Sequence, residues 1–100
     1  MTPFGLTLHE RFWRYVSRGE VNECWPWKGG LSSGYGRMAL RPRDGFNRRK
    51  EYAHRLSYMF HAGPIPRGME IDHMCKNRRC VNPFHLQCVT PEQNRQLIGL

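Results

Sequence analysis

The sequence has no apolar run approaching the ~18 residues that a membrane-spanning helix requires. Its opening stretch, MTPFGLTLHERFWRYV, also lacks the cationic start, apolar stretch and small-residue cleavage site of a secretory signal. Internal repeats and low-complexity tracts are absent as well. We therefore expect a protein that is not secreted, does not cross a membrane and acts in the cytoplasm.

Acidic residues are scarce in this chain, which has 8 Asp and Glu against 16 Lys and Arg and a net charge of +8. Such an excess says nothing about the fold. It does favour a polyanionic partner, most often nucleic acid. The alternative is a merely soluble cationic surface with no such partner.

The chain is short, and its 100 residues predict a single domain over residues 1–100. A domain of this size buries only a little over ~60% of its unfolded surface, so its apolar core alone gives little stability. Seven prolines and ten glycines imply much loop and little regular structure. Small domains of this kind usually carry a staple, either disulfides or a metal ion.

The four cysteines could form two disulfides or bind metal. Without a secretory signal metal is favoured, because clustered Cys and His in a reducing cytosol more often ligate metal than pair. Cys75, Cys80 and His85 are each separated by four residues, which lets one loop wrap three ligands around one ion. The alternative is that they are ordinary buried residues.

A tetrahedral structural zinc needs a fourth ligand, and two cysteines remain. Cys88 follows His85 by three residues on an expected strand, so it should point away from the side that His85 faces and serve as a small core residue. We favour Cys24, because a ligand so remote in sequence would tie the N-terminal half of the chain to the C-terminal half.

Residues 1–20 are expected to contain a short amphipathic helix. Thr7 is a candidate N-cap, Glu10 completes a capping box, and Gly19 ends the pattern. The apolar residues at helical spacing are expected to pack in the core. They are Leu8, Phe12, Tyr15 and Val16.

Residues 24–52 are expected to form a basic β-hairpin region. Residues 23–30 are predicted to form a short strand that runs into a glycine turn, and residues 34–40 a second strand. The hairpin loop has Asp44-Gly45 at its tip. Residues 50–53 complete the hairpin before a helix over 54–61.

The last part of the chain, residues 71–98, reads strand, long loop, strand, helix. The strands are predicted over 69–72 and 85–89. Thr90 and Gln93 form a second capping box, with Pro91 at the first helical position.

Three residues in this part have the chemistry of a phosphodiesterase. Asp72 and Asn94 offer the oxygen ligands that a hard cation such as Mg²⁺ prefers. His73 lies on the same expected strand as Asp72 but faces elsewhere, so it can act as a general base near neutral pH. An Asp-His pair alone is weak evidence, but the capped helix should bring Asn94 back towards it.

The stretch IDHMCKNRRCVNPFHLQCVTPEQN, residues 71–94, resembles the HNH endonucleases of the His-Me finger group. It is most similar to the zinc-bearing subset common in phages and related to the His-Cys box homing endonucleases. The upstream CWPWKGG, GYGRM and AHRLSYMFHAGPIPRG resemble the same subset, so the similarity covers residues 24–95. It implies an α+β fold of the ββα-metal type stapled by one structural zinc, and metal-dependent DNA cleavage in a bacterial or phage-infected cell.

The resemblance also implies roles for individual residues. His73 matches the general base, and Asp72 and Asn94 match the ligands of a catalytic Mg²⁺ or Mn²⁺. The residues matching the zinc ligands and the loop-bracing asparagine are Cys24, Cys75, Cys80, His85 and Asn82. The commonest HNH pattern often has His as the last metal ligand, whereas Asn94 agrees with the His-Cys box relatives. The chain has almost no extra DNA-reading parts, so a long recognition sequence is not expected.

Two groups of basic residues are expected to contact DNA phosphates. Arg78 and Arg79 lie near the active loop and are expected to hold the scissile strand. The other group lies on the hairpin and consists of Arg37, Arg41, Arg43, Arg48, Arg49 and Lys50. The alternative for the hairpin group is a solvated loop. His54 or Arg55 could also touch phosphate, and His61 is expected to be structural.

The alternative function is a non-catalytic, zinc-stabilised module that only binds nucleic acid. Such a module would be expected to lack His73 or Asn94, and both are present. The sequence is compatible with nicking or double-strand cleavage, and with a monomer or a homodimer, since the terminal RQLIGL could be a frayed end or a dimer contact.

Overall fold

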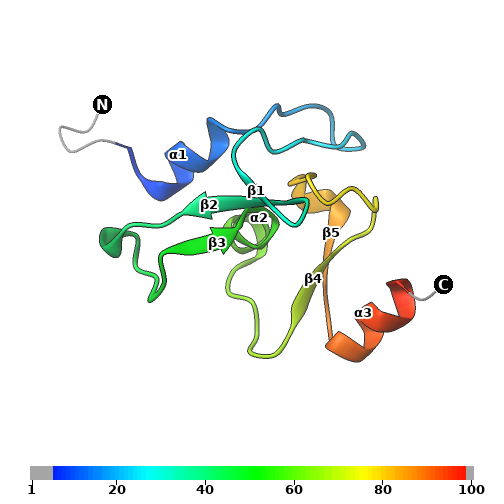
Figure 1. The fold of residues 1–100 in the computed structure, drawn as a ribbon. Coiled ribbons are helices and arrows are strands. Elements are labelled where there is room, and N and C mark those ends of the chain that lie inside the picture. Colours follow the sequence, from blue (N-terminus) through cyan, green and yellow to red (C-terminus); the bar gives the residue numbers. More distant parts are fainter. Residues whose placement is uncertain (1–5, 99–100) are drawn as a thin grey trace.

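Helix α2, Ala53–Ala62, lies between two small antiparallel sheets (Figure 1). The computed structural model describes residues 6–98, so residues 1–5 of the expected N-terminal region and the last two residues of RQLIGL lie outside the described part. One sheet has the order β1-β2-β3, and the other pairs β4 with β5. The α+β class with an upstream hairpin and short helices is confirmed.

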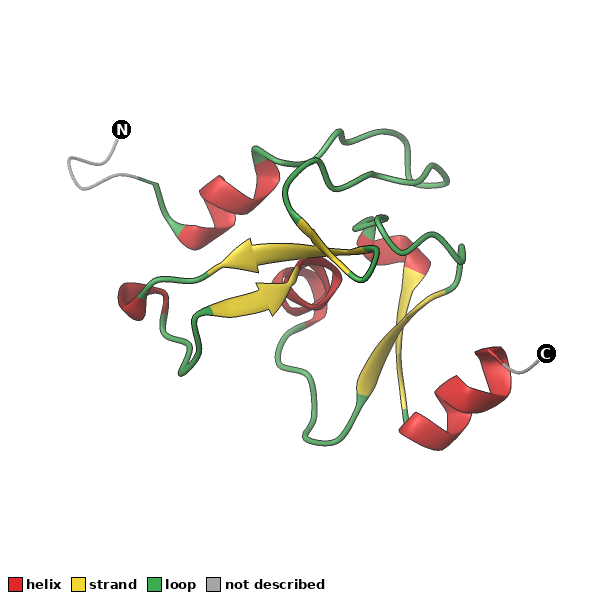
Figure 2. Cartoon of the chain, viewed as in Figure 1, coloured by secondary structure: helices red, strands yellow, loops and turns green. Residues whose placement is uncertain are grey.

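The remaining elements are short and are joined by long loops (Figure 2). Their bounds are α1 Leu8–Trp13, β1 Leu31–Ser32, β2 Tyr35–Ala39, a 3₁₀ turn Pro42–Asp44, β3 Lys50–Tyr52, β4 Glu70–His73, a 3₁₀ turn Pro83–His85, β5 Leu86–Val89 and α3 Pro91–Ile98. No helix among residues 6–98 is long and apolar enough to cross a membrane.

Helix α1 begins at the predicted capping box. The Thr7 hydroxyl accepts from the Glu10 N–H at 3.2 Å, and the Glu10 carboxylate accepts from the Thr7 N–H at 3.0 Å. This pair satisfies two of the N–H groups that a helix start leaves without partners.

The end of α1 differs from the prediction, because the helix stops at Trp13 and does not reach Gly19. The following backbone pairs with a distant segment instead, with Val16 bridged to Trp27. Leaving the helix at this point turns Tyr15 outwards, and it is 46% exposed. The expectation that Tyr15 packs in the core is therefore wrong.

The hairpin of β2 and β3 has the predicted turn at its tip. Gly45 adopts a φ of 88°, in the left-handed region that favours glycine. The Asp44 carboxylate accepts two hydrogen bonds from the Arg11 guanidinium, both at 3.0 Å. This ion pair lowers the pKa of Asp44 and fastens the hairpin tip to α1.

The segment expected to form a strand over 23–30 forms only isolated backbone bridges. Pro26 bridges to Cys80, flanked by hydrogen bonds from the Trp27 N–H to the Arg79 carbonyl at 2.8 Å and from the Val81 N–H to the Trp25 carbonyl at 2.9 Å. A continuous ladder is unfavourable here because proline has no N–H to donate. These bridges nevertheless join the two halves of the chain.

The main core lies between α1, α2 and the three-stranded sheet. Trp27 is only 1% exposed, and a Cβ added to Gly36 would come within 2.7 Å of its ring. Glycine at position 36 therefore lets β2 approach the indole. The buried residues of this cluster are Phe12, Val16, Trp25, Trp27, Met38, Leu40, Ala53, Leu56 and Val81.

The β4-β5 sheet and α3 form the ββα element. Its register places Asp72 opposite Gln87 and His73 opposite Leu86. The predicted capping box starts α3: the Gln93 N–H donates to the Thr90 hydroxyl at 3.1 Å, and the Gln93 side chain accepts from the Thr90 N–H at 2.9 Å.

Candidate functional site

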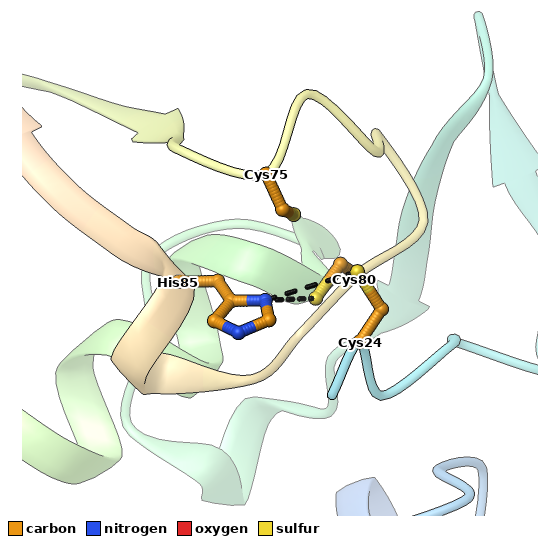
Figure 3. A group of neighbouring side chains, drawn as sticks. All are labelled: Cys24, Cys75, Cys80 and His85. Carbon is orange, nitrogen blue, oxygen red and sulfur yellow. Dashed lines mark hydrogen bonds between the residues drawn. The ribbon is translucent and has the colours of Figure 1, made fainter. Parts of the chain in front are cut away.

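Four side chains that are distant in sequence converge at one point (Figure 3). Cys75 follows β4, Cys80 ends the same loop, His85 ends the 3₁₀ turn before β5, and Cys24 comes from the N-terminal half. Their candidate ligand atoms all lie within 4.8 Å of one another. His85 Nδ1 is 3.7 Å from the sulfur of Cys24 and 3.6 Å from that of Cys80.

These distances fit one tetrahedral zinc ion. Zn–S distances of about 2.3 Å and Zn–N distances of about 2.0–2.1 Å place a sulfur and a nitrogen about 3.6 Å apart at the tetrahedral angle. Burial raises the pKa of Cys80 to about 12 and also raises that of Cys75, because desolvation disfavours the thiolate. A cation reverses that preference, since thiolates are the metal ligands. The cluster is therefore a candidate zinc site.

Asn82 is fully buried and links both sides of this cluster. Its side-chain amide donates to the carbonyls of Val21 and Glu23, at 2.8 and 2.6 Å. Its side-chain oxygen accepts from the Phe84 N–H at 3.0 Å. These bonds hold the segment before Cys24 against the turn that carries His85.

Cys88 lies outside the cluster, as expected, but not because it alternates with His85 along one strand. His85 belongs to the 3₁₀ turn and not to the strand, so the alternation of strand side chains does not relate the two residues. Cys88 lies opposite Ile71 on β5 and is half-buried.

Of the two expected cation ligands, Asp72 lies on β4 beside the carboxylate of Glu70, and Asn94 reaches Glu70 from α3. Glu70 and Asp72 share one face of the strand because strand residues two apart point the same way. Gln87 donates to Asp72 at 2.9 Å, and the Asn94 amide donates to Glu70 at 2.7 Å. The Asn94 side-chain oxygen is buried and has no hydrogen-bond partner among the described residues.

The opposite face of β4 carries His73, which is 6% exposed. Its ring lies 4.5 Å from the ring of His54 and 5.8 Å from that of Tyr35, measured between centroids. Burial lowers the pKa of His73, so the imidazole is neutral at neutral pH and can accept a proton. Its Nε2 atom has no hydrogen-bond partner within residues 6–98.

His54 lies in the interior of the protein and not on a phosphate-contacting surface. It is 7% exposed, and burial, assisted by His73 and Arg55, lowers its pKa to about 3. Arg55 pairs with the buried Glu51 at 3.4 Å. His61 is exposed and packs edge-on against Phe84 at 5.0 Å.

The two arginines of the active loop differ in their surroundings. The Arg78 guanidinium lies 5.2 Å from the centre of the Tyr35 ring, and its charge contributes to lowering the pKa of His73. Arg79 instead donates to the Trp27 carbonyl at 3.2 Å, so its guanidinium stabilises the backbone bridge between the two halves.

All six predicted hairpin cations are exposed, but they are not equivalent. Arg48 pairs with Glu51 at 3.1 Å and lies over the Phe46 ring. Arg37 projects from β2 opposite Tyr52, on the face away from the core.

Three residues beside the site were not predicted from the sequence: Glu70, Gln87 and Tyr35. Glu70 had a sequence signal, because it lies two residues before Asp72 on the same strand. The other two come from segments whose positions depend on the register of β5 and the path of β2.

Comparison with known proteins finds similarity in the part of the chain that carries this site. A sequence model of the HNH endonuclease family matches residues 51–96. The chain is 36% identical over 77 residues to Protein 7.7 of Escherichia phage T7, covering 76% of the chain and 55% of the relative. It is 35% identical over 72 residues to Protein 2.8 of the same phage, covering 71% of the chain and 45% of the relative.

A third relative matches over a shorter stretch. The gene 5.3 protein of Enterobacteria phage T3 is 58% identical over 36 residues, which is 36% of each chain. The chain thus spans about half or less of the length of these relatives. No solved structure matches it.

Strands β4 and β5 and most of α3 lie within the segment that matches the HNH endonuclease model. Residues 51–96 thus match the HNH endonuclease family, and the three relatives are phage proteins.

Proposed function

We propose that this protein is a metal-dependent DNA endonuclease with His73 as its general base. The observation that carries the proposal is the arrangement around β4, where His73, with its Nε2 atom unpartnered, lies on one face of the strand, and Asp72, with Asn94 of α3 nearby, lies on the other. A neutral imidazole can take the proton of an attacking water, typically worth 10²–10⁴-fold in rate.

The second requirement is a divalent cation, and we assign Mg²⁺ or Mn²⁺ to Asp72 and Asn94. The unpartnered Asn94 oxygen supports this choice, because hard cations take carboxylate and amide oxygens. Such a cation would stabilise the charge that develops on the phosphate and the leaving oxygen. Gln87 and Glu70 hold the two side chains in place through the hydrogen bonds that they form.

Zinc is proposed to be structural and to be held by Cys24, Cys75, Cys80 and His85. Four protein ligands fill a tetrahedral zinc and leave no position for water, which is typical of structural sites. Zinc and the catalytic cation would thus use different residues.

DNA is proposed to reach His73 across the outer face of β2. A catalytic base must contact its water, so we expect the Tyr35 side chain, whose ring lies near that of His73, or the Arg78 side chain over it to move when DNA binds. The hairpin cations extend this face and would contact flanking phosphates through charge.

The rival function is nucleic-acid binding without catalysis. Plasmid cleavage with and without added Mg²⁺ or Mn²⁺ separates the two. His73→Ala should remain folded, keep its zinc, bind DNA, and cleave at least about a hundredfold more slowly. His61→Ala is the matched control, because this exposed histidine lies outside the proposed site, and it should cleave normally. Cleavage by His73→Ala at the wild-type rate would refute the proposed mechanism.

A further inference from the structure

Helix α1 and strand β2 enclose a cleft that the proposed active site does not use. Strand β1 pairs only with Tyr35 and Gly36 of β2, which leaves the later edge of β2 without a neighbouring strand among residues 6–98. The cleft has a volume of about 720 Å³. Its basic lining residues are Arg11, Arg14, Arg37 and Arg41.

The charge of this cleft is mostly uncompensated. Arg11 is neutralised by Asp44 at 3.0 Å. Arg14, Arg37 and Arg41 are exposed and form no ion pair within 4 Å in the described part of the chain. Arg14 acts on the nearby Glu10 carboxylate and Arg41 on Asp44, but neither forms an ion pair, so the three guanidinium groups on this concave surface would attract an anionic ligand.

Tyr15 adds a hydrogen-bonding group to the same cleft. Its ring packs against the buried Trp27 with centroids 5.2 Å apart, and its side chain remains 46% exposed. Tyrosine hydroxyls commonly donate to DNA phosphates alongside arginine.

We propose that the cleft between α1 and β2 binds backbone phosphates of duplex DNA that flanks the scissile bond. This inference deepens the proposed function by adding Arg14 and Tyr15 to its DNA-binding surface. The cleft is continuous with the active site through β2, since Tyr35 lies 5.8 Å from His73 and Arg37 and Arg41 follow it along the chain.

The dimensions of β2 fit such a substrate. The six residue steps from Tyr35 to Arg41 cover about 20 Å in extended chain. This length corresponds to the axial rise of about six base pairs of duplex. A duplex whose scissile phosphate lies near the Tyr35 end of β2 can therefore place phosphates on one side of that bond in the cleft.

The test measures binding separately from cleavage. In a His73→Ala background without chelator, the dissociation constant for a duplex of about 30 base pairs is measured by fluorescence anisotropy over a range of salt concentrations. Arg14→Ala is compared with Arg14→Lys and with Arg67→Ala. Arg67 is an exposed arginine in the turn before β4, so its substitution removes the same charge away from the cleft.

Loss of one phosphate contact should lower the salt slope by about 0.9 and weaken binding by about eightfold at 0.1 M salt. Arg14→Lys should retain most of the slope, and Arg67→Ala should leave it unchanged. Arg37→Ala, on the opposite wall of the cleft, should repeat the effect if Arg14→Ala is poorly folded.

Two results would overturn the proposal. One is that Arg14→Ala and Arg37→Ala bind duplex with the same slope as Arg67→Ala. The other is that their loss of affinity is confined to single-stranded DNA of the same length. Both results concern binding and not cleavage. They would refute DNA binding by the cleft without bearing on the proposed nuclease mechanism.

Discussion

Asn94 has one side-chain atom paired and the other left without a partner. Its amide donates to Glu70, while its buried oxygen has no partner among residues 6–98. An unpaired buried oxygen costs free energy unless a ligand satisfies it. The hydrogen bond to Glu70 fixes the orientation of the amide, so that the oxygen is the atom presented to a cation.

Substituting this oxygen should weaken the cation site without damaging the fold. We expect Asn94→Ala to slow cleavage by at least about tenfold at limiting Mg²⁺, since even supporting residues of metal sites commonly contribute 10–100-fold. Part of the loss should return as Mg²⁺ is raised, because the deficit lies in cation affinity. Cleavage rates over a Mg²⁺ titration measure this effect, and an unchanged rate at limiting Mg²⁺ would contradict the assignment.

His54 makes the stability of the protein depend on pH. Burial lowers its pKa to about 3 in the folded state, whereas an unfolded chain takes up the proton near the ordinary value of 6.5. Below about pH 6.5 the unfolded state therefore binds more protons than the folded state. The contribution to stability is complete above that pH and is lost as the pH falls towards 3, by up to about 1.4 kcal/mol per pH unit.

Replacing His54 should flatten this dependence. The free energy of unfolding is measured by urea denaturation with excess zinc between about pH 7 and 5.5, for the wild type and for His54→Gln. Protonation of the zinc ligands affects both proteins, so the difference between their slopes isolates His54. Parallel curves would show that His54 does not stay neutral in the folded protein.

At the scale of elements, local signals predicted where most helices and strands begin. The capping boxes at Thr7 and Thr90 and the Asp44-Gly45 turn are encoded by a few adjacent residues, and each lies where it was expected. The end of α1 and the failed strand over 23–30 depend instead on pairing between distant segments. No pattern of adjacent residues in the sequence predicts that pairing.

In the candidate site, too, local features were predictable and contacts between distant elements were not. The spacing of Cys75, Cys80 and His85 within one loop predicted that they would meet. The packing of His54 and Tyr35 against His73 was not predictable, because it depends on how α2 and the hairpin stack on the β4-β5 sheet. Side-chain neighbours from separate elements require the tertiary structure.

The loop between β4 and β5 has little regular structure and should depend on its ligands. We expect Cys75→Ser to lose zinc and to give an unfolded or aggregating chain, because structural zinc contributes on the order of 10–16 kcal/mol of apparent binding energy. Cys88→Ser removes the same type of sulfur from β5, outside the cluster, and should be tolerated. Zinc content and far-ultraviolet circular dichroism compare the two variants. Equal zinc content in both would remove Cys75 from the ligand set.

At the scale of the whole molecule, two neighbouring links join the N-terminal half to the C-terminal half. The backbone bridge at Pro26 and Cys80 is one, and the cluster joining Cys24 to His85 is the other. Asn82 reinforces both from a fully buried position. A core this small gives limited stability by itself, so these links should decide whether the halves fold together.

Removing zinc with a strong chelator should therefore unfold both halves in one transition. Tryptophan fluorescence reports Trp13, Trp25 and Trp27, all in the N-terminal half, and hydrogen exchange of the β4 and β5 amides reports the C-terminal half. We expect the two probes to change at the same rate and to recover together when zinc returns, because the stabilisation comes from binding to the folded state alone. The opposite result would be that the β4 and β5 amides stay protected after the tryptophan signal has changed. In that case the cluster would stabilise only the N-terminal segment, and the ββα element would remain folded without zinc.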